Sequence, residues 1–320
     1  MNILFLTVSS DVTSNILCKW LINKNVKFSR LNLDISYEKL MISIENDKCE
    51  IVIGNIEVTS PKYTHVIYRR GEFKFKRLDI DNEYYKQIVK NLNAEENAIS
   101  EFIFHVLRSK PNFGSYFKER YQNKLLSLLH ANQSGFKIPI SLITTDNLSK
   151  VKEYFGQKNV VSKPVYNSFI IESKGRISHS YTTKVEFNNF LNKTSFKGSD
   201  YRFPTYYQEG IEVQFEIRIF YFLDIIEAAY IWTEKSGDYD YRINKNKINI
   251  GPYELPEKII QCVKKFIEIS KIETGSIDLL YTTKGEYVFL EVNPLGQFSN
   301  VSYFTNLNLE KKIIEKLCLI

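Results

Sequence analysis

The sequence is poor in the residues from which many metal and nucleophilic sites are made. It has 4 cysteines and 4 histidines in 320 residues. The cysteines lie far apart and form no CxxC pair, and no two histidines have the HExxH spacing. These absences argue against a zinc cluster, a disulfide framework and a histidine-based nucleophilic triad. We therefore expect a reducing, cytoplasmic location.

Long hydrophobic runs are also missing. The longest apolar region, residues 215–232, is interrupted by four charged side chains, so it does not predict a transmembrane helix. The apolar run over residues 3–8 is too short for a signal peptide and follows no basic leader, which favours a strand. We expect no membrane partner.

Charge of one sign is not concentrated in the chain. There are 43 lysines and arginines against 37 aspartates and glutamates, a net charge of +6. This excess is too mild for nucleic-acid binding by charge, and the one compact basic patch with aromatics, residues 74–77, is short. We expect no nucleic-acid partner, whereas an anionic small molecule or an acidic peptide suits the charge.

What the sequence does have is the periodicity of a mixed α/β (α+β) protein. At roughly 100 to 200 residues per domain, 320 residues predict two or three domains. An apolar run at residues 3–8 and a helical period over residues 12–23 open a βα unit, which favours a parallel sheet. Further elements are expected as strands at residues 27–33, 49–53 and 65–68 and as a helix at residues 84–106.

Proline and glycine in residues 110–114 mark the first domain boundary. Leucines at helical spacing then predict one helix over residues 116–132. The remaining elements follow from apolar alternation and turn residues. They are paired strands at residues 160–165 and 169–172, a strand pair at residues 215–221 and 225–232, a helix at residues 256–269 and a hairpin at residues 276–292.

The hairpin carries the most informative polar residues, Asp278, Glu291 and Asn293. With a turn at residues 282–285, the expected register pairs Tyr281 with Glu286 and Asp278 with Phe289. All three polar side chains then share one face, and their oxygens suit Mg²⁺. A solvated face of an edge hairpin is the alternative, but both carboxylates lie within apolar runs, where an uncompensated charge is unfavourable.

Two lysines are candidate phosphate ligands. Lys163 ends an apolar strand before a proline, so its ammonium group projects from apolar surroundings. Lys124 lies on the helix expected before residues 135–139 and supplies a second positive charge. Taken singly, each lysine also fits a surface residue whose stem covers apolar neighbours. The hairpin carboxylates favour the phosphate role.

Arginines add further candidates. Glu216 and Arg218 are two apart in a strand pattern and share a face, where the guanidinium offers a fork of donors to a phosphate or an oxyanion. A cross-strand ion pair is the alternative, and the same ambiguity holds for Arg242. Arg69 and Arg70 end a strand, either as a solvated strand end or as a ligand contact.

Taken in chain order, these motifs resemble those of the ATP-grasp ligases. The matching segments are Lys124, residues 135–139, 162–164 and 207–211, Glu216, Arg218, Asp278 and residues 290–294. Within that superfamily the chain is similar to the graspetide (microviridin-type) branch and most similar to the grasp-with-spasm peptide maturases. Residues 68–70, 240–242, 275–278 and 291–298 carry this finer match.

The resemblance implies an ATP-grasp fold in three parts. These are an N-terminal pre-ATP-grasp domain with a parallel sheet (residues 1–114), a central subdomain (residues 115–205) and a C-terminal subdomain with the Mg/ATP site (residues 206–320). ATP would lie between the last two. The chain departs from the family pattern in having no Gly-rich phosphate loop between Lys163 and Gln208. A polar flap would cover the phosphates instead.

The resemblance also implies roles for single residues. Lys124 and Lys163 would bind phosphates, and Asp278, Glu291 and Asn293 would hold Mg²⁺. The adenine hinge would comprise Gln208, Glu209, Gly210 and Ile211, with Glu212 as the candidate ribose ligand. Arg218 would stabilise the phosphoryl group or the acyl intermediate, and Glu216 and Arg242 are the other catalytic candidates.

The implied activity is that of an ADP-forming ligase that closes macrocycles. It would activate Asp and Glu side chains of a ribosomal precursor peptide, which has a leader and a core rich in Thr, Lys and acidic residues, as acyl phosphates. A Lys amine or a Ser/Thr hydroxyl would then form an ω-amide or ω-ester. A ligase that adds a free amino acid, similar to glutamate-adding ATP-grasp enzymes, needs the same ATP site. A non-catalytic nucleotide-binding regulator is the alternative from another class, and the sequence leaves a homodimer open.

Overall fold

The computed structural model describes residues 1–77, 84–166, 170–173, 176–179, 182–187, 203–233 and 248–319. Its first part is a parallel sheet with the strand order β2-β1-β7-β9. The strands are β1 (Asn2–Thr7), β2 (Lys27–Asn32), β7 (His65–Tyr68) and β9 (Asn112–Phe113). The apolar residues of β1 are all buried, as expected for a parallel strand that is covered on both faces. The expected parallel sheet is confirmed.

Two helices cover the two faces of this sheet. α1 (Val12–Asn23) packs Leu17 and Leu21 against Ile3 and Phe5, and α2 (Tyr85–Leu107) packs its C-terminal turns against Leu4 and Leu6. Smaller sheets extend this part of the chain. They consist of β4 (Leu40–Glu45), β5 (Lys48–Ile53) and β6 (Ile56–Glu57), which are antiparallel, and of β3 (Ser36–Tyr37) with β8 (Lys74–Phe75).

The single helix expected over residues 116–132 is wrong, because the structure has two helices there. α3 (Tyr116–Arg120) ends before Asn123, and α4 (Lys124–Gln133) begins directly after it. The side-chain oxygen of Asn123 accepts hydrogen bonds from the backbone N–H groups of Leu125 and Leu126, at 3.0 and 3.2 Å. Such an N-cap satisfies helix-terminal donors and starts a new helix.

A central sheet of four strands has the order β10-β15-β11-β14. Its strands are β10 (Ser141–Thr144), β11 (Val160–Ser162), β14 (Thr183–Lys184) and β15 (Thr205–Glu209), and α5 (Leu148–Phe155) packs on it. The expected pairing of residues 160–165 with 169–172 is wrong. β11 instead pairs with β14 and β15, while β12 (Ile170–Ser173) pairs with β13 (Arg176–His179), the next strand along the chain.

The C-terminal sheet is antiparallel with the order β18-β17-β16-β19-β20. Its strands are β16 (Val213–Phe222), β17 (Ile225–Thr233), β18 (Ile248–Tyr253), β19 (Thr274–Thr282) and β20 (Tyr287–Asn293). One face packs against α4 and α6 (Glu257–Ser270) through Ile217, Ile219 and Leu279. Strand alternation therefore turns Arg218 and Asp278 to the other face.

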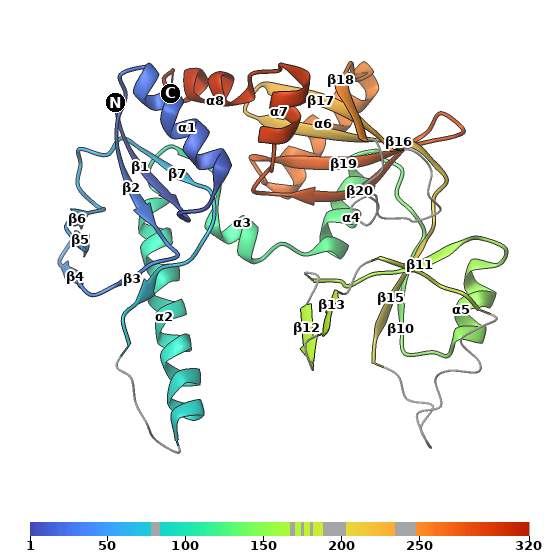
Figure 1. The fold of residues 1–320 in the computed structure, drawn as a ribbon, viewed down its shortest axis with the longest axis horizontal. Coiled ribbons are helices and arrows are strands. Elements are labelled where there is room, and N and C mark those ends of the chain that lie inside the picture. The colour runs from blue at the N-terminus through green and yellow to red at the C-terminus, as the bar shows by residue number, and fades with distance from the viewer. Residues whose placement is uncertain are drawn as a thin grey trace.

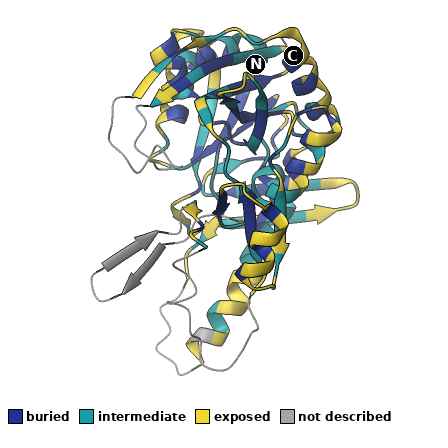
Figure 2. Ribbon diagram, turned by 90° about the vertical axis from the view of Figure 1, so that its right-hand side faces the viewer, coloured by how far each residue is buried: buried dark blue, intermediate teal, exposed yellow. Residues whose placement is uncertain are grey.

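That other face meets the N-terminal part of the chain and the last two helices, α7 (Ser299–Thr305) and α8 (Leu309–Leu317). Figure 1 shows the N-terminal sheet on the left, the C-terminal sheet at the upper right and the central sheet below it. Figure 2 shows buried residues concentrated in the body that holds both termini. Among the described helices, none combines the length and hydrophobicity of a membrane span.

Candidate active site

The β19–β20 hairpin carries the three expected metal ligands on one face. Asp278 lies directly opposite Glu291, and Asn293 lies opposite Ser276, which is two residues from Asp278. Directly paired residues share a face, and alternate residues along a strand return to it. Asp278, Glu291 and Asn293 therefore point to the same side of the sheet.

The register of the hairpin nevertheless differs from the expected one. The turn is one residue longer than the sequence indicated, and a β-bulge adds a second residue, Leu290, to β20. A shift of two residues returns a side chain to its original face, so the two errors cancel. The expected pairs were Tyr281–Glu286 and Asp278–Phe289, and the observed pairs are Tyr281–Tyr287 and Asp278–Glu291.

Both candidate phosphate lysines lie beside Glu291. The Nζ atom of Lys124, at the start of α4, is 3.9 Å from a carboxylate oxygen of Glu291 and 3.5 Å from the carbonyl oxygen of Pro164. Lys163 follows β11 and places its ammonium group 5.5 Å from the centre of the Tyr206 ring. Burial lowers the pKa of Lys163 to about 8, while Glu291 raises it and Lys124 lowers it further.

Arg218 extends the polar face across the sheet. The register places Glu291, Asp278, Arg218 and Ala229 in one row that crosses β20, β19, β16 and β17. A guanidinium nitrogen of Arg218 is 3.6 Å from a carboxylate oxygen of Asp278. Glu216 lies on the same face, two residues before Arg218. Arg242, the third catalytic candidate, lies outside the described residues.

The expected hinge residues join β15 to β16. The side-chain amide of Gln208 donates to the hydroxyl groups of Ser141 and Tyr206, at 3.1 and 2.6 Å, so it is held within the central sheet. The carboxylate of Glu209 pairs with Lys158. The backbone N–H of Gly210 donates to the carbonyl oxygen of Asn159 at 2.8 Å.

Ile211 and Glu212 complete this connection. The carbonyl oxygen of Glu212 accepts from the backbone N–H of Thr283 at 3.3 Å, beside the turn of the hairpin. Residues 208–212 thus connect the central sheet to the C-terminal sheet. The side chains of Gln208 and Glu209 in this connection already have partners within the protein. Their expected roles toward adenine and ribose remain a prediction.

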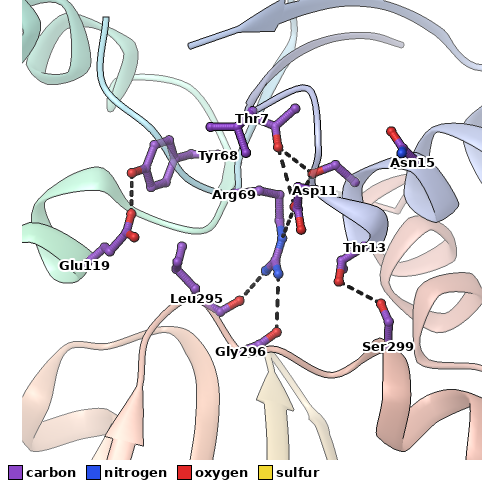
Figure 3. A network of polar contacts seen from close by, with 12 residues as sticks. Thr7, Asp11, Thr13, Asn15, Tyr68, Arg69, Glu119, Leu295, Gly296 and Ser299 are labelled. Atoms are coloured by element: carbon purple, nitrogen blue, oxygen red, sulfur yellow. Dashed lines mark hydrogen bonds and ion pairs between the residues drawn. The ribbon is translucent and has the colours of Figure 1, made fainter. Parts of the chain in front are cut away.

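Arg69, which the sequence left between two interpretations, is neither solvated nor free to bind a ligand. It is 1% exposed and lies between the N-terminal sheet and the loop after β20. Its guanidinium donates to the carbonyl oxygens of Leu295 and Gly296 and lies 3.8 Å from the carboxylate of Asp11 (Figure 3). Arg69 therefore fixes the loop that begins at Asn293.

The start of β19 also packs against Asn293. A Cβ atom on Gly275 would lie 2.8 Å from the carbonyl oxygen of Asn293 and 3.0 Å from the hydroxyl of Tyr221. The side-chain oxygen of Asn293 accepts from the backbone N–H of Leu295 at 3.1 Å. Glycine at position 275 thus permits the close approach that sets the position of Asn293.

The fold of the chain is shared with solved structures, whereas no protein-family model and no curated protein matches the sequence. The structure of macrocyclase MdnC from Microcystis aeruginosa, bound with precursor peptide MdnA, has a TM-score of 0.79 at 21% identity, with 100% of each chain covered. A RiPP-associated ATP-grasp ligase of Chryseobacterium gregarium, in complex with ADP and a leader and core peptide, has a TM-score of 0.80 at 22% identity, covering 99% of this chain and 96% of that one. The ATP-grasp ligase PsnB, complexed with minimal precursor, Mg and ADP, has a TM-score of 0.75 at 15% identity, covering 99% and 96%. The chain has the ATP-grasp fold.

In this ATP-grasp fold, the donor set on β19 and β20 fits a divalent cation. Within the described ranges, no three His, Cys, Asp or Glu side chains gather as a metal cluster, so the candidate set is two carboxylates and one amide. All three donors are hard oxygens on one face, which suits Mg²⁺. Each carboxylate also faces a cationic side chain, Asp278 beside Arg218 and Glu291 beside Lys124.

Proposed function

We propose that this chain is an ADP-forming ATP-grasp ligase that closes macrocycles in a ribosomal precursor peptide. The observation that carries the proposal is the row of Glu291, Asp278 and Arg218 on one sheet face, with Lys124 and Lys163 beside Glu291. Acidic oxygens and cationic side chains at one place suit a nucleotide with its metal. Similarity in fold to peptide macrocyclases over nearly the whole chain supports the peptide substrate.

The proposed reaction has two steps. An oxygen of a substrate Asp or Glu carboxylate attacks the γ-phosphorus of ATP, and the bond to the β,γ-bridging oxygen breaks, which releases ADP and leaves an acyl phosphate. A Lys amine or a Ser/Thr hydroxyl of the same peptide then attacks the acyl carbon and loses its proton, and inorganic phosphate leaves. Each ring removes the elements of one water from the peptide.

The side chains of this enzyme would contribute mainly charge and position, as is usual in phosphoryl transfer. Lys163 and Lys124 would hold the phosphates, and Arg218 would neutralise the phosphoryl group or the oxyanion of the acyl intermediate. Glu216 and Arg242 would assist there. Asp278, Glu291 and Asn293 would hold Mg²⁺, which neutralises phosphate charge when bound.

The nucleotide would lie between the central and C-terminal sheets. Lys163 follows β11 of the central sheet, whereas Glu291 lies on β20 of the C-terminal sheet and Lys124 on α4, which packs on that sheet. Gln208, Glu209, Gly210 and Ile211 would line the adenine through the main chain, and Glu212 would bind the ribose.

Co-expression with a short peptide that is rich in Thr, Lys and acidic residues and encoded beside the gene tests this function. Intact-mass spectrometry should show the loss of one water for each ring. A gain of one residue mass would instead indicate addition of a free amino acid. ATP binding without ADP release in the presence of any such peptide would indicate a regulator.

A pair of variants tests the metal assignment within the same hairpin. Glu291→Gln should abolish ADP release while circular dichroism stays unchanged. Glu286→Gln is the matched control, because Glu286 lies near the turn, half-exposed, and pairs with Lys137. Unchanged ADP release in Glu291→Gln would remove Glu291 from the site.

A further inference from the structure

Asn293, one of the three candidate metal ligands, lies where its strand ends. It is the last residue of β20, whereas Asp278 and Glu291 lie inside the ladder, with paired residues on both sides of them. Backbone pairing therefore fixes the two carboxylates more firmly than the amide. The direction of the Asn293 side chain depends on the loop that follows, residues 294–298.

This loop folds back onto Asn293 through two hydrogen bonds. The backbone N–H of Leu295 donates to the side-chain oxygen of Asn293 at 3.1 Å, and the N–H of Gly296 donates to its carbonyl oxygen at 3.0 Å. An amide oxygen has two lone pairs, so the side-chain oxygen can accept this hydrogen bond and still bind a cation. The position of Leu295 thus sets the direction of the candidate ligand.

Arg69 holds the same two loop residues from the other side. Its guanidinium donates to the carbonyl oxygens of Leu295 and Gly296, as Figure 3 shows. The central carbon of the guanidinium lies 5.3 Å from the centre of the Phe298 ring, at the far end of the loop. The carboxylate of Asp11 lies 3.8 Å away and supplies the counter-charge that a buried cation requires. These contacts fix the loop relative to β7, which Arg69 follows.

Arg69 does not itself belong to the charged row. It follows β7 of the N-terminal sheet, whereas the candidate ligands lie on β19 and β20 of the C-terminal sheet. The contacts run from Arg69 to Leu295 and from Leu295 to Asn293, so an arginine can act on a metal ligand without touching the metal. Loss of a group that orients a metal ligand typically lowers metal affinity by about 10- to 100-fold.

We propose that Arg69 is a positioning residue for the metal site: by holding Leu295, it directs the side-chain oxygen of Asn293 toward a divalent cation. In this role Arg69 touches neither the cation nor the nucleotide. The proposal rests on the proposed function, in which Asn293 binds Mg²⁺. It gives the N-terminal sheet, which supplies none of the three expected ligands, control over metal affinity.

The effect of Mg²⁺ on ADP affinity measures this role without any peptide. Calorimetric titration of the full-length protein with ADP, once in excess Mg²⁺ and once in EDTA, gives the factor by which Mg²⁺ tightens ADP binding. In Arg69→Lys this factor should fall about tenfold, while the ADP affinity in EDTA stays unchanged. Lysine keeps the charge opposite Asp11 but lacks the fork of donors that reaches two carbonyl oxygens. An unchanged factor would overturn the proposal.

A double variant shows whether Arg69 acts through Asn293. Asn293→Ala should lower the magnesium factor at least as much as Arg69→Lys does. The two substitutions combined should lower it no further than Asn293→Ala alone, because both remove the same ligand from the cation. Losses that multiply in the double variant would assign the effect of Arg69 to another route and would overturn the proposal.

Leu317→Ala is the control for stability. Leu317 is fully buried in α8, in the same apolar cluster as Phe298 but outside the loop, so its truncation destabilises the protein and should leave the magnesium factor unchanged. An equal fall in this variant would show that the factor follows stability alone, against the proposal. If Arg69→Lys does not fold, Asp11→Asn combined with Arg69→Met takes its place with the same expected result, since removal of both buried charges is tolerated better than removal of one.

The outcomes separate this role from the ligation itself. An ADP affinity that Mg²⁺ leaves unchanged in the unsubstituted protein would overturn both the metal site and the role of Arg69. Loss of water from a precursor peptide, together with an unchanged magnesium factor in Arg69→Lys, would overturn the role of Arg69 alone. A magnesium factor that depends on Arg69, without loss of water from any peptide, would support the positioning role and overturn the peptide ligation.

Discussion

The C-terminal sheet meets its two neighbouring sheets in different ways. Toward the N-terminal sheet it shares one hydrophobic core, in which Ile3, Phe5 and Phe113 pack with Phe220, Phe222 and Phe298. The central sheet has a core of its own, built from residues such as Val151, Phe155 and Tyr207. Among its described strand residues, Tyr206 alone belongs to the C-terminal core.

We call the N-terminal and C-terminal sheets together the platform, and the central sheet with α5 the lobe. A shared apolar core and the buried Arg69 bind the N-terminal and C-terminal sheets into one body, whereas the central sheet has a core of its own and continues into the C-terminal sheet through the main chain of residues 208–212. Sheets with separate cores are expected to move relative to each other unless a large apolar interface joins them. The proposed nucleotide would then be held between the fixed carboxylates and a lobe that carries Lys163.

The largest effect should come from a glycine where the chain leaves the platform. A Cβ atom on Gly114, at φ +85°, would lie 2.0 Å from the carbonyl oxygen of Tyr68. Gly114→Ala should lower the free energy of unfolding by about 3 kcal/mol or more, through steric overlap and a left-handed backbone. Urea denaturation measures this value.

The matched control lies on the central lobe. Gly156 also has a positive φ, +61°, but a Cβ atom there meets nothing within 4 Å. Gly156→Ala should therefore lower the free energy of unfolding by about 1 to 3 kcal/mol, the strain of the backbone alone, and by less than Gly114→Ala. Equal losses in the two variants would show that packing at the platform does not set its stability.

The second-largest effect should come from Arg69, the buried arginine that joins the N-terminal sheet to the loop after β20. Arg69→Met would leave Asp11 buried without its counter-charge and the carbonyl oxygens of Leu295 and Gly296 without their donor. Loss of one partner of a buried pair costs about 3 kcal/mol. The variant should unfold at a correspondingly lower urea concentration.

Lys137→Met is the comparison at the surface, on the segment that follows α4 and bridges β20. Its pair with Glu286 is half-exposed, and such pairs contribute between about 0 and 1 kcal/mol. Were Lys137→Met to destabilise the protein as much as Arg69→Met, burial would not be what gives the Arg69 contacts their larger contribution.

The smallest effect should come from the titration of Lys163, which would lie beside the proposed nucleotide. Burial lowers the pKa of Lys163 to about 8, so the protonated fraction of the free enzyme falls about tenfold between pH 7 and pH 9. ADP affinity, measured by calorimetry, should fall by about the same factor. In Lys163→Arg the fall should vanish, since arginine stays charged. A fall that persists in this variant would assign the pH dependence to another group.

Folding stability should have the opposite pH dependence. In the unfolded chain Lys163 keeps its ordinary, higher pKa, so the unfolded state binds more protons above about pH 8. The contribution of Lys163 to stability therefore rises as the pH increases through this window. Lys163→Met should remove that rise, and hydrogen exchange at several pH values measures it.

The sequence predicted the platform elements better than the junctions. The helix over residues 12–23 and the strand over residues 65–68 have the expected bounds, since apolar periodicity is a local signal. The break between α3 and α4 was missed because it depends on the side-chain cap at Asn123. The shared face of Asp278 and Glu291 was expected, although the register that produces it was not.

The sequence by itself determined the residue types of the candidate site and their order, because chemistry and strand alternation are properties of short segments. Tertiary structure decided that Lys124, Lys163 and Glu291 come together. It also decided that Arg69 donates to the carbonyl oxygen of Leu295, which is 226 residues away in the chain. These contacts join residues far apart in the chain, and burial and charge at a position depend on which distant segments pack around it.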